Sequence, residues 1–173
     1  MWTKGGLTTF YLLFVMRVAN RRVHFSGCTV NPTTPWMRQI GRNLTDPFDG
    51  FLLNLRYLLM DRNSRYSPEF RALLKGAGVN CVRLPPRSPN LTPHIERFMR
   101  SIKAECLERM IFFGERSLRQ AIDAFCAHHD RERNHQGLEN RVIEPGEEVG
   151  RKEGEVICRE RLGVMLRYYR RAA

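Results

Sequence analysis

The sequence has no apolar segment long enough to cross a membrane. Its N-terminal apolar run, Phe10–Met16, has seven residues, whereas a membrane-spanning helix needs about 20. Arg17 follows this run, and no small-residue cleavage pattern of a signal peptide comes after it. We therefore expect a buried strand at this position and no membrane partner.

The cysteine patterns that are typical of disulfide frameworks or zinc sites are also missing. The five cysteines are an odd number, and no two of them form a CxxC pair. This spacing favours reduced thiols in a cytoplasmic protein. Cys126, His128, His129 and His135 are zinc-ligating residue types, but no second close pair of ligands accompanies them. Ordinary packing and surface roles are the better interpretation of these four residues.

Acidic residues are scarce relative to basic ones. The chain has 29 Lys and Arg against 18 Asp and Glu, which gives a net charge of +11. Such an excess favours a polyanionic partner, because the basic groups neutralise phosphates and release counterions. A solvated basic surface, a ribosome-associated protein and a polybasic protein at a membrane surface are the alternatives at this point.

The first part of the chain predicts a β-hairpin and a helix. At 173 residues with 42% hydrophobic composition, the chain fits one domain with a core of its own and a short appendage. Thr8–Arg17 and Val23–Val30 have strand-like composition, and Val18–Arg21 supplies a polar turn between them. Asn31–Pro35 then ends the hairpin and caps a helix over Trp36–Leu44.

The following elements alternate between strands and helices. Arg56–Met60 and Val79–Leu84 are typical of short strands, and Ser67–Lys75 between them is typical of a capped helix. Ser117–His129 predicts an amphipathic helix. Before it comes a long helix whose apolar positions at helical spacing are Leu91, Ile95, Phe98, Ile102 and Cys106. This order indicates an α/β domain with a mixed sheet.

Two carboxylates occupy positions suited to phosphodiester chemistry. Such chemistry usually needs two divalent metal ions, and Mg²⁺ prefers carboxylates around an open cleft. Asp61 directly follows a predicted buried strand, where ligand sites form in α/β folds, and Glu96 lies in the first turns of the long helix. Each has an ordinary alternative: Asp61 forms the turn after the strand, and Glu96 is a surface residue paired with Arg100.

The neighbours of Glu96 favour the functional interpretation. Glu96, Arg100 and Lys103 are spaced i, i+4 and i+7, so they lie on one helical face opposite the apolar stripe. A carboxylate beside two cations suits a metal ligand with phosphate contacts next to it. A salt-bridged face exposed to solvent is the alternative.

Four segments share their order and spacing with a known family. They are Leu59–Tyr66 with Pro68–Phe70, Gly78–Val79 with Arg83–Asn90, Ile95–Leu107, and a closing signature formed by His128–Asp130 with Asn134–Leu138. They resemble the motifs of integrase-core (DDE) transposases of bacterial insertion sequences, the retroviral-integrase type. Thirty-four residues separate Asp61 from Glu96, which is close to the family's spacing.

The resemblance implies an RNase H-like fold, with a mixed sheet flanked by helices, and two Mg²⁺ or Mn²⁺ ions for DNA strand cleavage and transfer. By position, Asp61 would be the second catalytic carboxylate and metal ligand, and Glu96 the third. Arg100 and Lys103 fall where family members contact DNA near the active site. The basic residues that we expect to add DNA phosphate contacts are Arg83, Arg87 and Arg97.

The same resemblance suggests a division of the chain and a set of partners. Residues 1–145 would be the integrase catalytic core, and residues 146–173 a basic C-terminal appendage. The expected partners are DNA and further copies of the chain assembled on it, with no small-molecule substrate. We expect the protein in the bacterial cytoplasm, at the nucleoid when it is bound to DNA.

The chain also departs from the family pattern. The family's first catalytic aspartate lies on a strand before the hairpin, but here only Met1–Leu7 precede the hairpin and no acidic residue occurs before Asp46. Arg17, Asn63 and Pro93 are further departures. The resemblance thus implies a missing first strand, weakened metal binding and a truncated copy that is inactive in strand transfer. The alternative is a non-catalytic basic DNA-binding protein that keeps the fold.

Overall fold

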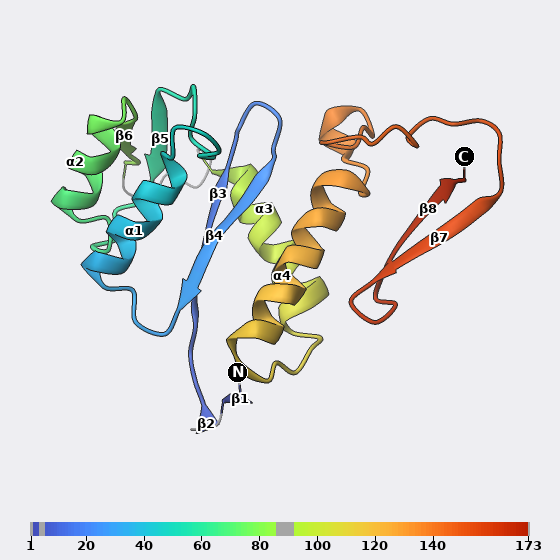
Figure 1. Ribbon diagram of the computed structural model, residues 1–173, viewed down its shortest axis with the longest axis horizontal. Helices are drawn as coiled ribbons and strands as arrows, with labels where there is room; N and C mark the ends of the chain where they lie inside the picture. Colours follow the sequence, from blue (N-terminus) through green and yellow to red (C-terminus); the bar gives the residue numbers. More distant parts are fainter. Residues whose placement is uncertain (1, 4–5, 86–91, 173) are drawn as a thin grey trace. The chain divides into compact units, whose positions relative to one another are not determined.

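Helices alternate with two-stranded β-sheets in the computed structural model, which describes residues 2–3, 6–85 and 92–172 (Figure 1). The α/β class predicted from the sequence is therefore confirmed. The described strands pair in four separate two-stranded sheets, so their union into one mixed sheet stays a prediction. The chain divides into two units. The terminal unit contains Met1–Thr8, Phe14–Phe25 and His94–Ala173, and the central unit contains Thr9–Leu13 and Ser26–Pro93.

The predicted hairpin is present, with strands slightly shorter than expected. Strands β3 (Tyr11–Met16) and β4 (Val23–Thr29) are hydrogen-bonded neighbours. Their turn is closed by the Arg17 N–H, which donates to the Arg22 carbonyl at 2.9 Å. Arg21 in this turn has φ of 63°, a left-handed conformation that is uncommon outside glycine. Before the hairpin, β1 (Trp2–Thr3) and β2 (Gly6–Leu7) form a separate antiparallel pair.

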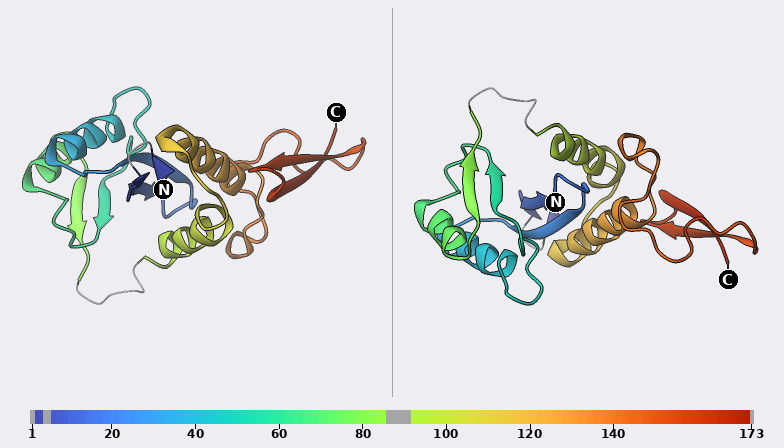
Figure 2. Two further views of the ribbon diagram at one scale, coloured as in Figure 1. Left: turned by 90° about the horizontal axis from the view of Figure 1, so that it is seen from below. Right: turned by 90° about the horizontal axis from the view of Figure 1, so that it is seen from above.

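The central unit places two capped helices on one face of a parallel strand pair. Strands β5 (Tyr57–Met60) and β6 (Asn80–Arg83) are parallel, and both views of Figure 2 show helices α1 (Thr34–Leu44) and α2 (Pro68–Gly76) on the same side of them. The Thr33 hydroxyl caps α1 and the Ser67 hydroxyl caps α2, each by accepting a backbone N–H of the first turn. The most deeply buried side chains of this unit are Leu44, Phe70 and Leu74.

The helices of the terminal unit pack through aromatic side chains. Helix α3 (Pro93–Ile102) and helix α4 (Gly114–Arg131) meet at Phe98 and Phe125, whose ring centroids lie 5.9 Å apart. Phe98 also contacts Phe14 of the hairpin, with centroids 5.3 Å apart. None of the described helices is long and apolar enough to cross a membrane.

The long helix predicted through Cys106 changes its geometry part of the way along. Residues Lys103–Leu107 form a π-helix, η2, and the Glu108 N–H donates to the Lys103 carbonyl at 2.9 Å. The extra residue in this turn moves the following side chains round the axis, which a regular helical spacing does not anticipate. Phe98, Ile102 and Cys106 are nevertheless buried, as the apolar stripe predicts. Leu91, the first position of that stripe, lies outside the described residues.

A C-terminal hairpin was not foreseen from the sequence. Strands β7 (Val156–Arg161) and β8 (Leu166–Arg171) pair antiparallel where we expected only a charged appendage. The hairpin is attached to the end of α4 through Glu132, whose side chain is 2% exposed. Arg161 donates to both Glu132 oxygens, at 2.7 and 2.9 Å, and His128 Nδ1 bonds the same carboxylate at 3.0 Å. A buried ion pair, rather than an apolar stripe, joins this hairpin to the helix.

Phe125→Ala should destabilise the protein strongly. The side chain is fully buried between α3 and α4, and a Phe to Ala change in a core costs about 3–5 kcal/mol. Urea unfolding followed by circular dichroism measures the free energy of unfolding. Phe113→Ala is the control because Phe113 is 76% exposed, and we expect it to change stability by less than about 0.5 kcal/mol. Equal effects of the two substitutions would contradict the observed core.

Glu132→Gln should lower the free energy of unfolding at neutral pH by about 2 kcal/mol, since it leaves a buried cationic partner without its counter-ion. Burial raises the pKa of Glu132, but the hydrogen bonds and charges of Arg161 and His128 outweigh that effect, so the pKa lies below its usual value. The stabilisation is therefore present above the unfolded pKa of about 4.3 and is lost as the pH falls through the folded value. Urea unfolding at pH 7 and pH 3 should show a large difference between wild type and variant only at pH 7. Glu147→Gln, at an exposed glutamate, should leave both values unchanged.

Candidate functional site

Asp61 lies directly after β5 in the central unit, as predicted, and its side chain is exposed. Its Oδ1 accepts the backbone N–H of Asn63 at 2.9 Å, and Asn63 Oδ1 in turn accepts the N–H of Arg65 at 3.0 Å. Asp61 therefore does form the turn after the strand. A carboxylate has about four lone-pair sites, so this single bond leaves Asp61 able to bind a further group.

The charge of Asp61 acts on a neighbouring tyrosine. Burial raises the pKa of Tyr66 to about 12, and the negative charge of Asp61 contributes to the rise. The Tyr66 ring packs on Phe70 of α2, with centroids 5.8 Å apart. Tyr66 thus stays protonated at any physiological pH and is a neutral neighbour for Asp61.

The parallel pairing of β5 and β6 brings one predicted basic residue to the same sheet edge as Asp61. Met60 is the register partner of Arg83, so Asp61 and Arg83 both lie at the carboxyl ends of these strands. Arg62 Nε donates to the Leu84 carbonyl at 3.0 Å and ties the two strand ends together. Arg83 is exposed. Arg87, which we also predicted as a DNA contact, lies outside the described residues.

Glu96 and its basic neighbours occupy the exposed face of α3 in the terminal unit. The side chains of Glu96, Arg97 and Arg100 are exposed, while Phe98 and Ile102 are buried on the opposite face. Lys103 is also exposed, but it is the first residue of the π-helix and forms an ion pair of 3.5 Å with Glu108. Because both partners are largely exposed, this pair is weak and leaves Lys103 available to another anion.

The described carboxylates do not form a complete two-metal site. In residues 2–3, 6–85 and 92–172, no three His, Cys, Asp or Glu side chains gather closely enough to hold a metal ion. Asp61 belongs to the central unit and Glu96 to the terminal unit, and the cations Arg62 and Arg65 follow Asp61 in the chain. Two clustered metal ions need several converging carboxylates, which the donor set of the described residues does not supply.

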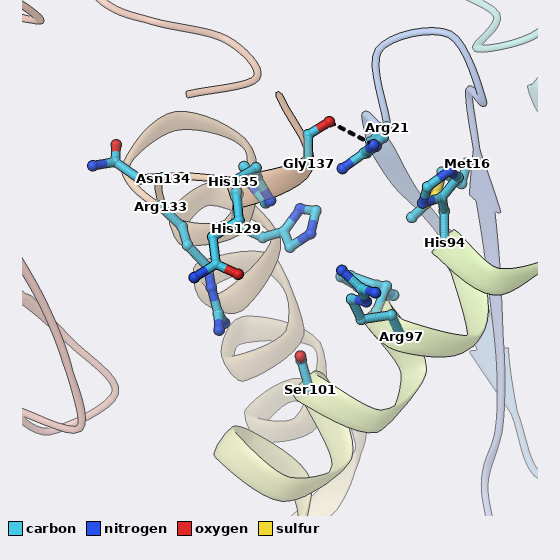
Figure 3. Close-up of a pocket in the computed structure, with 12 residues that line it drawn as sticks. Met16, Arg21, His94, Arg97, Ser101, His129, Arg133, Asn134, His135 and Gly137 are labelled. Atoms are coloured by element: carbon cyan, nitrogen blue, oxygen red, sulfur yellow. Dashed lines mark hydrogen bonds between the residues drawn. The ribbon is translucent and has the colours of Figure 1, made fainter. Parts of the chain in front are cut away.

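The closing signature forms a buried polar network at the end of α4. Asp130 is 6% exposed; its carboxylate accepts the backbone N–H of Val23 at 3.3 Å and is bonded by His129 Nδ1 at 2.8 Å. His135 Nε2 donates to the His129 carbonyl at 2.7 Å. Arg21 of the hairpin turn donates to the Gly137 carbonyl at 2.7 Å, as the dashed line in Figure 3 shows. The signature therefore attaches the hairpin turn to helix α4.

The closing signature was recognised in the sequence, but no role was predicted for its residues. Arg21 and Arg133, which lie close to the signature in the structure, were also missed. The available signal was the density of histidine and aspartate at the end of an amphipathic helix, where a surface helix would normally have solvated residues. Their partner Val23 is 107 residues away in the chain, so no local pattern pointed to it.

Asp130→Ala should loosen the hairpin. The Val23 N–H would lose its described acceptor in a buried position, which costs about 1–3 kcal/mol. Hydrogen exchange measured by NMR should show a Val23 amide that exchanges about 5- to 150-fold faster, the change that such an energy produces. Asp123→Ala, at an exposed aspartate of the same helix, should leave this rate unchanged. An unaltered Val23 rate in Asp130→Ala would show that the bond does not hold the hairpin.

Residues 77–142 match the family model of the integrase core domain. No curated protein matches the chain. The matched segment contains Glu96, the basic face of α3 and the whole closing signature, whereas Asp61 precedes it. The resemblance recognised in the sequence is thereby confirmed for this segment: residues 77–142 are similar to the integrase core domain.

Proposed function

We propose that this protein binds DNA and belongs to the machinery of DNA transposition and integration. Integrase core domains generally bind DNA and depend on divalent metal ions. The observation that carries the proposal is that the matched segment includes an exposed basic face on α3, formed by Arg97, Arg100 and Lys103 beside Glu96. A net charge of +11 supports a polyanionic partner.

The proposal includes an RNase H-like arrangement of the core, with its boundary near residue 145. The order of elements supports it, since a hairpin (β3–β4) is followed by a parallel strand pair (β5–β6) and then by helices α3 and α4. Strands that pair in both senses and alternate with helices are typical of a mixed α/β sheet. Copies of the chain assembled on bacterial DNA at the nucleoid belong to the same proposal.

Asp61 and Glu96 are the candidate catalytic carboxylates and metal ligands in this proposal. Mg²⁺ or Mn²⁺, when bound, would neutralise charge on the phosphodiester and activate the attacking oxygen. Residues 1–45 of the sequence contain no acidic residue, so the chain itself offers no third carboxylate on its hairpin. We therefore expect the 173-residue chain by itself to bind DNA without efficient strand transfer.

A non-catalytic DNA-binding role is the second candidate, and the cationic surroundings of Asp61 favour it. Arg62 and Arg65 follow Asp61 within four residues of the chain, and Arg83 lies at the same strand ends. Cations around a carboxylate attract phosphate and compete with a divalent ion. The basic face of α3 serves both candidates equally, so a catalytic assay is needed to separate them.

Arg100→Gln and Lys103→Gln should each weaken binding of a fluorescein-labelled random-sequence duplex. Each substitution that removes a phosphate contact should reduce the slope of log K against log salt by about 1. Fluorescence anisotropy at several salt concentrations measures this slope. Arg116→Gln is the control, since Arg116 is an exposed arginine of α4 outside the basic face. Identical slopes for wild type, the two variants and the control would exclude this face from DNA binding.

Nicking of supercoiled plasmid in Mn²⁺ separates the catalytic from the non-catalytic candidate. We expect the 173-residue chain to show no nicking activity that requires Glu96. If wild type does nick and Glu96→Gln abolishes the product while duplex binding is retained, the protein is a working enzyme. Binding without any such product supports the DNA-binding role.

A further inference from the structure

A pocket of about 360 Å³ lies in the terminal unit, between α3, the end of α4 and the hairpin turn (Figure 3). Three arginines and three histidines line it, and none of the described lining residues is acidic. These six residues are Arg21, Arg97, Arg133, His94, His129 and His135. A concave site with this composition favours an anionic ligand, because the walls around a pocket concentrate the electric field of its charges.

The charge of the pocket is only partly compensated. Arg133 forms an ion pair with Glu105, at 2.7 and 3.0 Å from its two oxygens. Among the described residues, the Arg21 side chain bonds only the neutral carbonyl of Gly137, and the Arg97 side chain has no hydrogen bond or ion pair. Two arginines from different elements, the hairpin turn and α3, therefore present their positive charge to the same space.

The pKa values of two histidines are consistent with a positive potential in this space. Burial lowers the pKa of His94, and the charges of Arg21 and Arg97 lower it further. Burial also lowers the pKa of His135, with contributions from the charges of His129 and Arg133 that its hydrogen bond to the His129 carbonyl partly opposes. An anion in the pocket would relieve the repulsion that both histidines experience.

The remaining walls suit more than an isolated phosphate. Ser101, Asn134 and Gln136 offer hydroxyl and amide groups that can donate and accept hydrogen bonds. Phe98 and the His129 ring, whose centroids are 5.0 Å apart, form an aromatic wall. The volume lies within the range of about 300–1,000 Å³ that is usual for small-molecule sites, and nucleotide bases pack against such aromatic and amide surfaces.

We propose that this pocket binds a single nucleotide unit, with its phosphate at Arg21 and Arg97 and its sugar and base against Phe98, His129 and the amide side chains. The site shares Arg97 with the exposed face of α3 that we assign to the duplex backbone, but its other lining residues lie outside that face. The assignment of this pocket depends on the proposed function in one respect only, namely that the nucleotide unit comes from a DNA strand.

The closing signature shapes this site through Gly137. A Cβ atom at position 137 would lie 2.5 Å from Arg21 Nη1, so the glycine leaves room for the guanidinium. The Gly137 carbonyl then holds that guanidinium by a hydrogen bond. The signature residues thus position the arginine from the hairpin turn that, with Arg97, would hold the phosphate.

Calorimetric titration of the full chain with a deoxynucleoside 5′-monophosphate, the matching nucleoside and inorganic phosphate tests the site. The monophosphate should bind most tightly, because only it can use both the arginines and the aromatic wall. Arg97→Gln and Arg21→Gln should each weaken its binding about tenfold or more, as expected for the loss of a charge-assisted phosphate contact. Arg116→Gln should bind like wild type, and thermal melting verifies that each variant is folded.

NMR titration of the His94 ring provides an independent readout. The monophosphate should raise the His94 pKa, and Arg97→Gln should raise it in the free protein as well, since each change reduces the positive potential at His94. A His94 pKa that neither change affects would overturn the phosphate position.

The outcomes also separate this site from the proposed function. Duplex binding without monophosphate binding would overturn the pocket and leave the proposed function intact. Monophosphate binding without duplex binding would support the pocket and overturn the proposed function. Inorganic phosphate that binds as tightly as the monophosphate would overturn the nucleotide assignment.

Discussion

The buried carboxylate of Asp130 is the interaction on which the terminal unit depends. It accepts the N–H of Val23 from the hairpin and bonds the His129 ring, while the carbonyl of the same residue accepts the N–H of Glu144 at 2.7 Å. Burying a charged group is costly unless it is bonded, so the Val23 and His129 contacts offset the cost of burying this carboxylate. One residue thereby fixes the hairpin, the end of α4 and the segment that follows it.

The Asp130 network also positions helix α3 and thereby determines which of its side chains are exposed. His129 is held by Asp130 and packs edge-on against Phe98, with centroids 5.0 Å apart, so the buried face of α3 is positioned by the same network. Glu96 and Arg100 then lie on the exposed face, and Arg97 lies at the pocket beside it. The closing signature therefore has a physical role in supporting the helix that carries Glu96. The signature can thus influence the position of Glu96 through the packing of α3, without contacting Glu96 itself.

The sequence predicted the elements whose causes are local. Thr33 and Ser67 cap α1 and α2 as hydroxyl residues before a proline-containing first turn do, and the hairpin follows from two strand-like segments around a polar turn. The C-terminal hairpin was missed because its attachment is an ion pair between Glu132 and Arg161, which leaves no apolar period in the strands. The pocket was missed because it depends on a contact between the hairpin turn and the signature, which are 116 residues apart in the chain.

The local positions of the two candidate carboxylates were predicted correctly, but these positions alone do not establish a metal site. Asp61 lies at the end of a strand and Glu96 in the first turn of α3, both exposed and both as predicted. A carboxylate has about four lone-pair sites, so the number of lone pairs does not limit metal binding. A pair of metal ions also needs several carboxylates close together, and like charges repel when no ion lies between them, so each added carboxylate raises the cost. Arginines accompany each of these carboxylates in the sequence. Their positive charges reduce the repulsion between carboxylates, and they also attract phosphate. The DNA binding that we propose therefore does not require the metal site to be complete.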